Sequence, residues 1–306
     1  MRLVFWDQSF HKKTNSSEFF LRLINPNVEV MRRWDDRWQG GEQPDVGEID
    51  ALNPDVVIFF QAIPPAHELL KLRCPTKIWV PMWDSVWFLP DRAWLPYLVV
   101  DIKIVSFCTA LHEKVSGLGF KSFYIQYFPR PSVKVADDEG SSVFFWHRRS
   151  DINWSVVRAL LNDSDIKTMF YKRDPDPNCT IDSPSDIDIG RFNIQTIEGW
   201  ISKREYMECL GRCNVFIAPR AYEGIGLANL EAMSRGLCVV SPDYPTANEY
   251  IKDGVSGFLY DIENPPPIDL STANRLGHSA RQSISDGYGR WENDKKKIQD
   301  LINQRI

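Results

Sequence analysis

Long apolar runs are absent from this sequence, and their absence excludes a membrane-spanning helix of ordinary length. One of the longest, residues 56–60 (VVIFF), is far shorter than the ~18–20 residues that a span requires. Residues 1–6 are apolar, but the stretch is too short for a secretory signal and Asp7 interrupts it. We therefore expect a cytoplasmic protein.

Cysteine clusters and an excess of positive charge are also missing. The six cysteines are scattered without a CxxC pair, so we expect reduced, buried thiols rather than a zinc site. A formal net charge of −5 gives no overall field that would attract nucleic acid or anionic lipid, and we expect no nucleic-acid partner. The 43% of hydrophobic and 25% of charged residues are typical of soluble globular proteins and exclude a disordered chain, a collagen and a coiled coil.

Short β-branched and aromatic runs alternate with helical patterns along almost all of the 306 residues. Such alternation predicts parallel βαβ units, and the length corresponds to about two domains. The pattern breaks at residues 128–140, where two prolines are followed by the polar run DDEG. We predict an α/β fold with two Rossmann-like, doubly wound domains facing a cleft. The predicted parts are residues 1–133, residues 134–286 and a tail helix over residues 287–306.

The expected elements follow from the local patterns. Strands are expected over residues 2–6, 55–59, 77–81, 102–107, 123–127, 142–146, 167–171, 192–196, 215–218, 237–241 and 258–260. Helices are expected over residues 17–23, 110–118, 154–161, 203–211 and 227–234. Residues 173–190 are rich in proline and aspartate, too polar for a core, and we expect a long surface loop there.

The most informative segment is residues 215–231, VFIAPRAYEGIGLANLE. An apolar strand is followed by a glycine-bearing loop, and a helix begins near Leu227. A helix start binds anions through its unpaired N–H groups and its positive dipole end, and Gly226 lets an oxyanion approach the backbone closely. Because Glu223 and Glu231 cannot bind phosphate, hydroxyl groups are their natural partners. The segment therefore predicts a ligand with phosphate and polyol parts: a nucleotide, a sugar phosphate, or both joined.

The two glutamates lie eight positions apart across the glycine loop, in the pattern E-x7-E (EGIGLANLE). In this frame the sequence resembles the retaining, family-4 type of GT-B glycosyltransferases, the glycosyl transferases group 1. The resemblance extends over residues 196–260, with strand, loop, helix and following turn in family order, and is weaker over the first 140 residues. It implies the GT-B fold, a nucleotide-sugar donor and no cofactor. Helix-start capping on a solvated face is the alternative role for both glutamates.

Position by position, the resemblance implies that Glu231 binds the nucleotide ribose and that Glu223 faces the donor sugar as a catalytic residue. The backbone of residues 197–200 would hold the base, and backbone amides of the glycine loop would hold the diphosphate. The substrate-binding residues expected in these segments are Glu198, Gly199, Trp200, Arg220, Gly224, Ile225, Gly226, Leu227, Ala228 and Glu231.

Cationic partners for the diphosphate are expected after the first strand of the second domain, where the loop reads FFWHRRSDINW. The resemblance implies an arginine here, and we assign Arg148 as catalytic and Arg149 as substrate-binding. The lysine that the family has five positions later is missing, which removes a cation that would neutralise the leaving group. Lys172, with Arg173, is a candidate substitute, and we include Lys172 in the substrate site. For Arg148, Arg149, Lys172 and Arg173, the alternative is that they are ordinary charged loop residues. We expect His147 to be a loop or core histidine.

In the first domain, Asp84 follows the strand end WVPMW, where the family often has a His-Asp pair. The resemblance implies a catalytic contact with the acceptor hydroxyl or the sugar, and a helix N-cap is the alternative. His11, Lys12 and Lys13 either contact the acceptor or are side chains without a role on a mobile loop. The resemblance also implies that the tail helix crosses back to the first domain, with a freely solvated helix as the alternative.

Two acidic motifs in the expected surface loop, DPD at 174–176 and DID at 186–188, superficially resemble the metal-binding DxD of the other glycosyltransferase fold. No apolar strand end precedes either motif, so we expect no catalytic metal.

The resulting hypothesis is retaining transfer of a hexose, with glucose favoured, from a UDP-sugar to a carbohydrate or lipid-linked saccharide acceptor in polysaccharide or glycolipid biosynthesis. Because no nucleophile is well placed in the sequence, a front-face reaction in which the leaving phosphate takes the acceptor proton is favoured. Two alternatives stay open: a GT-B-fold sugar-nucleotide epimerase or hydrolase, and a non-catalytic nucleotide-sugar-binding subunit. Peripheral contact with the inner membrane through the N-terminal domain is also left open.

Overall fold

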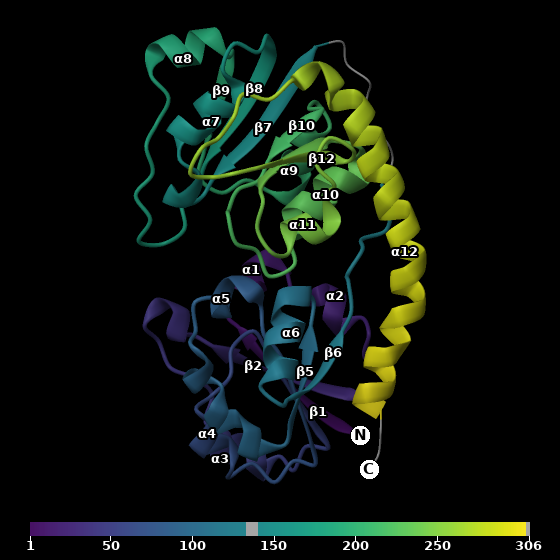
Figure 1. Ribbon diagram of the computed structural model, residues 1–306. Helices are drawn as coiled ribbons and strands as arrows, with labels where there is room; N and C mark the ends of the chain where they lie inside the picture. The colour runs from purple at the N-terminus through teal and green to yellow at the C-terminus, as the bar shows by residue number, and fades with distance from the viewer. Residues whose placement is uncertain (133–139, 304–306) are drawn as a thin grey trace. The chain divides into compact units, whose positions relative to one another are not determined.

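The computed structural model describes residues 1–132 and 140–303 (Figure 1). The chain divides into two compact units. The N-terminal unit consists of Met1–Gln126 and Arg290–Ile306, and the C-terminal unit is Tyr127–Gly289. The predicted boundary between residues 133 and 134 falls in a segment that lies outside the described residues.

The N-terminal unit contains a six-stranded parallel sheet with the order β2-β1-β3-β4-β5-β6. Its strands are β1 (Arg2–Gln8), β2 (Glu29–Asp35), β3 (Val56–Phe60), β4 (Thr76–Val80), β5 (Ile102–Ser106) and β6 (Lys121–Tyr124). Its helices are α1 (His11–Thr14), α2 (Glu18–Leu21), η1 (Arg37–Gln39), α3 (Val46–Ala51), α4 (Ala66–Leu69), α5 (Trp83–Val86), η2 (Asp91–Ala93), η3 (Leu95–Val100) and α6 (Thr109–Gly117). All five residues of β3 are buried, because helices cover both faces of a central parallel strand.

The strand β2 was missed by the sequence analysis, and its position explains why. It lies at the edge of the sheet and pairs only with β1 among the described strands. Most of its residues are half-buried, and its sequence, EVMRRWD, mixes charged with apolar side chains. An edge strand needs no continuous apolar run, so the pattern that identified the central strands is weak here.

The C-terminal unit contains a second six-stranded parallel sheet, with the order β12-β11-β10-β7-β8-β9. Its strands are β7 (Ser141–His147), β8 (Ile166–Arg173), β9 (Ile194–Glu198), β10 (Val215–Ile217), β11 (Cys238–Pro242) and β12 (Gly257–Tyr260). Its helices are η4 (Ser150–Ile152), α7 (Trp154–Leu161), α8 (Asp186–Arg191), α9 (Lys203–Leu210), α10 (Leu227–Arg235), α11 (Ala247–Tyr250) and η5 (Leu270–Thr272). The prediction of two doubly wound α/β units is confirmed.

The expectation of one long surface loop over residues 173–190 is wrong for its last five residues, because α8 begins at Asp186. Ser185 caps this helix and forms a capping box with Asp188. Asp188 is buried and accepts hydrogen bonds from Trp154 Nε1 and Arg158 Nε, each at 3.0 Å. The capping pattern Ser-x-x-Asp was present in the sequence, but the polar composition concealed it.

The last helix, α12 (Ala273–Asn303), begins fourteen positions before the predicted start at residue 287. Its residues up to Gly289 belong to the C-terminal unit and its residues from Arg290 belong to the N-terminal unit. In the C-terminal unit, Gly277 packs against the backbone of Gly236, so closely that a Cβ atom at Gly277 would lie 2.0 Å from the Gly236 oxygen. In the N-terminal unit, Gln299 Nε2 donates to the Leu23 carbonyl at 3.2 Å. No helix within the described residues is long and apolar enough to cross a bilayer.

Candidate functional site

Most of the predicted site residues lie at one place in the C-terminal unit, the carboxyl ends of β7 and β10. These two strands are neighbours, and the strand order reverses between them. In open parallel sheets, loops on the two sides of such a reversal leave in opposite directions and open a crevice in which ligands bind. Arg148 and Arg149 follow β7, and the loop of residues 218–226 follows β10. Asp151 connects the two loops by accepting a hydrogen bond from the Ala221 amide at 2.9 Å.

The glycine loop ends at an uncapped helix start. Gly226 is the N-cap of α10, has a left-handed φ of 75°, and receives no side-chain capping bond. A side chain at Gly226 would have room, since the nearest atom to its Cβ would be Asn229 Nδ2 at 3.6 Å, so the dihedral angle rather than crowding favours glycine. The nine residues of α10 direct the N–H groups of its first turn, at Leu227 and Ala228, toward the loop. This arrangement can hold an anion.

Glu223 lies just before this helix start and is buried. Its Oε2 atom is 3.8 Å from Nη1 of Arg220, and both side chains are at least 85% buried. Thr246 Oγ1 donates to the Glu223 carbonyl at 2.8 Å and so anchors the loop to the segment before α11. Thr246 itself has a φ of 81°, a conformation that a β-branched residue adopts only at energetic cost. The loop around Glu223 is therefore held by contacts from two other segments.

The cations predicted for the diphosphate are paired with carboxylates of the segment after β8. Arg148 donates to Asp176 Oδ1 from Nε at 3.0 Å and from Nη2 at 2.7 Å, and Arg149 Nε donates to Asp176 Oδ2 at 2.9 Å. Burial alone would raise the pKa of Asp176, but the two guanidinium groups outweigh it and lower that pKa. Lys172 is 2% exposed and donates to Asp174 Oδ2 at 2.6 Å. Ordinary loop charge is therefore the wrong description of Lys172.

Trp146 was missed by the sequence analysis, and two of these cations lie over its ring. The guanidinium carbon of Arg148 is 4.6 Å from the ring centroid, and Lys172 Nζ is 4.1 Å from it. Trp146 and Lys172 are register partners in β7 and β8, so both side chains leave the same face of the sheet. Two cations over one indole are stabilised by its π electrons. Trp146 is the last residue but one of β7, so an aromatic residue near the end of this strand was the available signal.

Residues predicted to hold the base and ribose lie on α10 and on the segment after β9. Glu231 is 33% exposed and pairs with Lys203 Nζ, at the start of α9, a residue that the sequence analysis did not include. Trp200 is 47% exposed, and its ring centroid lies 6.0 Å from Lys172 Nζ. Gly199 has a φ of 69°, as a tight turn after β9 requires. Glu198 is exposed and lies 3.6 Å from Arg173 Nη1.

Part of the C-terminal unit matches a known protein family. Residues 193–268 match the family model of glycosyl transferases group 1. Alpha-maltose-1-phosphate synthase of Mycobacterium tuberculosis (strain CDC 1551 / Oshkosh) is 34% identical over an alignment of 102 residues, and the match covers 27% of this chain and 26% of that protein. The chain thus spans about a quarter of the length of this curated relative.

Solved structures are similar over the whole chain. Sucrose-phosphate synthase from Thermosynechococcus elongatus has a TM-score of 0.67 at 12% identity, with 98% of each chain covered. Anabaena HepE in complex with UDP and glucose has a TM-score of 0.63 at 13% identity, with 97% of this chain and 99% of that chain covered. The whole chain thus has the fold of these GT-B proteins, and residues 193–268 match the group 1 family. The segment matched by the family model contains the glycine loop, Glu223, Glu231 and α10.

Two residues of the N-terminal unit, Asp84 and His11, differ from what the sequence analysis left open. Asp84 lies in the first turn of α5, but the N-cap is Met82, so the N-cap alternative for Asp84 is wrong. Ser85 Oγ donates to Asp84 Oδ1 at 3.4 Å. His11 is 4% exposed, and its Nδ1 lies 2.5 Å from Oδ1 of the buried Asp7. His11 is therefore a buried residue of α1 and not a side chain of a mobile loop, whereas Lys12 and Lys13 are exposed.

His147, at the end of β7, is a core histidine, as the sequence analysis favoured. It is fully buried, its Nδ1 is 2.8 Å from the Tyr171 hydroxyl, and its Nε2 is 3.7 Å from Asp182 Oδ1. Burial lowers its pKa to about 4. A histidine that is neutral at pH 7 carries no charge to a phosphate site, so His147 is a packing residue.

The acidic motifs of the segment after β8 also have structural partners. Asp174 and Asp176 face Lys172 and the two arginines, and Asp188 faces Trp154 and Arg158. In the parts of the chain that the structure describes, no three His, Cys, Asp or Glu side chains come together as a metal would require.

Proposed function

We propose that this chain is a glycosyltransferase that binds a UDP-sugar in its C-terminal unit and transfers the hexose, glucose in the favoured version, to a hydroxyl of a carbohydrate or lipid-linked saccharide. The observation that carries this proposal is the buried Glu223–Arg220 pair beside an uncapped helix start with Gly226 in a left-handed conformation. HepE, which has this fold, was solved with UDP and glucose, and that supports the choice of donor.

In the proposed complex the diphosphate lies against the amides of residues 225–228. Bond cleavage at the sugar C1 atom increases the negative charge on the diphosphate, and the helix start stabilises that charge more strongly in the transition state than in the ground state. Arg148 and Lys172 add positive charge at the same edge of the sheet, with Asp176 and Asp174 holding their side chains in place. Glu223 faces the sugar, and Glu231 binds the ribose hydroxyls once Lys203 releases it.

We further propose that the anomeric configuration is retained and that no metal takes part. Glu223 is paired with Arg220, and its negative charge would stabilise a cationic sugar in the transition state. In the N-terminal unit, Asp84 would contact the acceptor hydroxyl. The acceptor oxygen then forms a bond to C1 as the C1–O bond to phosphate breaks, and its proton passes to the departing phosphate.

One observation favours a second candidate, a non-catalytic nucleotide-sugar-binding subunit. Asn153 stands where the family lysine is expected, and its side chain caps α7 by accepting from the Val156 amide at 3.2 Å. A capping asparagine adds no positive charge to the leaving group. In this alternative the site binds the nucleotide sugar but does not catalyse transfer of the sugar.

The test is incubation of the protein with labelled UDP-glucose, with and without oligosaccharide acceptors, followed by NMR of the products. Transfer with an α-linked product supports the proposal, and a β-linked product overturns retention. Free glucose or an epimer without transfer would identify a hydrolase or epimerase. Binding of UDP-glucose without any turnover would identify the binding subunit, and absence of UDP binding would overturn the proposed donor.

A further inference from the structure

Gln61, the residue directly after β3, has a backbone conformation that glutamine rarely adopts. Its φ is 66°, in the left-handed region, where a residue with a Cβ atom is held at energetic cost. Neighbours on β4 fix this turn: the Gln61 amide donates to the Val80 carbonyl at 2.9 Å, and the Gln61 carbonyl accepts from Trp79 Nε1 at 3.2 Å. Both bonds use backbone atoms of residue 61, so glycine would form them without that cost and asparagine with a smaller one.

The glutamine side chain joins this turn to α5. Its Nε2 atom donates to Ser85 Oγ at 2.7 Å, and Ser85 Oγ donates to Asp84 Oδ1 at 3.4 Å. Glycine has no side chain, and the side chain of asparagine is one methylene shorter and would not reach Ser85. The link to α5 therefore accounts for glutamine at a position whose backbone favours other residues.

Gln61 and α5 lie where a parallel sheet of this topology binds ligands. The strand order of the N-terminal sheet reverses between β1 and β3, and in open parallel sheets ligands bind outside the carboxyl ends of the strands at such a reversal. Gln61 follows β3, and Asp84 and Ser85 follow its neighbour β4. All three residues are half-buried, so part of each is in contact with solvent.

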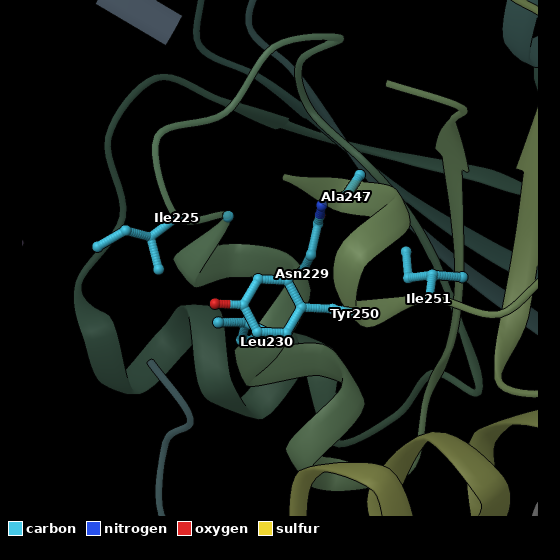
Figure 2. Close-up of a pocket in the computed structure, with 7 residues that line it drawn as sticks. Ile225, Asn229, Leu230, Ala247, Tyr250 and Ile251 are labelled. Carbon is cyan, nitrogen blue, oxygen red and sulfur yellow. The ribbon is translucent and has the colours of Figure 1, made fainter. Parts of the chain in front are cut away.

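Contact with solvent separates Gln61 from Asn229, another polar residue in a costly setting. Asn229 lies in the C-terminal unit and is buried, and its amide has no hydrogen-bond partner among the described residues. The pocket that it lines together with Leu230 and Tyr250 has no room for a water molecule (Figure 2). No substrate can enter that pocket in this structure, whereas the residues around Gln61 are open to one.

We propose that Gln61 is a positioning residue of the acceptor site, where it holds Asp84 in the orientation that binds a hydroxyl group of the saccharide acceptor. This inference rests on the proposed function, in which Asp84 contacts that hydroxyl. Because Ser85 Oγ accepts from Gln61, its own proton is directed to Asp84 Oδ1. Fixing one oxygen of the carboxylate sets the direction of the other, and with it the direction from which the acceptor hydroxyl binds.

The test measures transfer from UDP-glucose to the oligosaccharide acceptor on which the wild type is active. We expect Gln61→Asn to raise the KM for the acceptor about tenfold, since Asp84 loses its fixed orientation, and to leave kcat and the KM for UDP-glucose unchanged. Ser85→Ala removes the middle of the same chain of hydrogen bonds and should have the same effect. The double variant should be no worse than either single variant, because both side chains act through one contact.

Thermal unfolding without ligand separates positioning from stability. Gln61→Asn should unfold at the temperature of the wild type, because asparagine tolerates the left-handed conformation better and this gain offsets the lost hydrogen bond. Gln43→Asn is the matched control and should alter none of the kinetic constants. It shortens another half-buried glutamine of the N-terminal unit, whose Nε2 donates to Glu68 Oε2 at 2.6 Å.

The outcomes separate this inference from the proposed function. If the wild type transfers the sugar and Gln61→Asn leaves the KM for the acceptor unchanged, the role of Gln61 is overturned and the proposed function stands. A lower unfolding temperature with equal rises in both KM values would show a purely structural role and also overturn it. If the wild type binds UDP-glucose but transfers to no acceptor, both proposals are overturned.

Discussion

Glu223 and Glu231 are both acidic and lie on the same loop and helix, but their surroundings differ. Glu223 is buried against Arg220, whereas Glu231 is partly exposed and held by Lys203. We predict that Glu223→Gln lowers kcat by about 100-fold, because a neutral amide stabilises a cationic transition state less well, and leaves the Kd for UDP unchanged. Glu231→Gln is the matched control and should weaken UDP binding. Equal effects of both variants on UDP binding would contradict the separate roles.

His147 predicts a pH dependence of stability with a definite sign. Burial lowers the pKa of His147 from its ordinary value of 6.5 to about 4, so the folded state keeps the ring neutral. Between these two values the unfolded state binds a proton that the folded state does not. Stability from this residue is therefore complete above about pH 6.5 and falls by about 1.4 kcal/mol per pH unit as the pH drops toward 4.

Urea unfolding at pH 7, 6 and 5 measures this dependence. His147→Gln should flatten the decline in the free energy of unfolding, since glutamine does not titrate. An unchanged slope in the variant would show that other groups cause the decline. His67, which is 75% exposed, provides the control, and His67→Gln should leave the slope as it is.

At the scale of elements, α12 depends on one close backbone approach. A Cβ atom at Gly277 would lie 2.0 Å from the Gly236 oxygen and 2.8 Å from its carbonyl carbon, so the helix or the turn after α10 would have to move. We predict that Gly277→Ala destabilises the protein by at least ~2 kcal/mol. Gly289→Ala in the same helix has nothing within 4 Å and should be stabilising by ~0.5–1 kcal/mol, because alanine is the better helix former. If this contact is correct, chemical unfolding will show a lower free energy of unfolding for Gly277→Ala and a higher one for Gly289→Ala than for the wild type.

Elements were predictable where their residues follow one strong pattern. The central strands are continuous apolar runs, and α7 matches the predicted residues 154–161 because Asn153 caps it and its apolar residues recur at helical spacing. The strand β2 and the helix α8 were not predicted. Both are polar elements at an edge or on the surface, and their formation depends on neighbours that are distant in the sequence. Propensity and periodicity do not contain that information.

For the whole molecule, the end of α12 is part of the N-terminal unit although it is remote from it in sequence. Trp291 is 5% exposed, and its ring lies 6.4 Å from that of Phe19. We predict that Trp291→Ala lowers the free energy of unfolding of the N-terminal unit by ~3 kcal/mol. UDP binding should be unchanged, because the proposed donor site lies in the C-terminal unit.

Two measurements check this prediction: thermal unfolding and UDP titration of the same variant. Lys297→Ala is the control, since Lys297 is 68% exposed and its ion pair with Asp294 contributes little. A loss of UDP affinity in Trp291→Ala would show that the donor site depends on the N-terminal unit.

The sequence by itself determined the fold class and the location of the glycine loop. Both follow from local patterns: apolar runs that alternate with helices, and a glycine at a helix start between two glutamates. Only the tertiary structure decided which charges meet. Arg148 and Arg149 are paired with Asp176, and Lys172 is paired with Asp174, because β7 and β8 are neighbours and bring these segments together at the carboxyl ends of the strands. Pairing between charges depends on distances in space, and in a parallel sheet those distances are set by strand order rather than by separation along the chain.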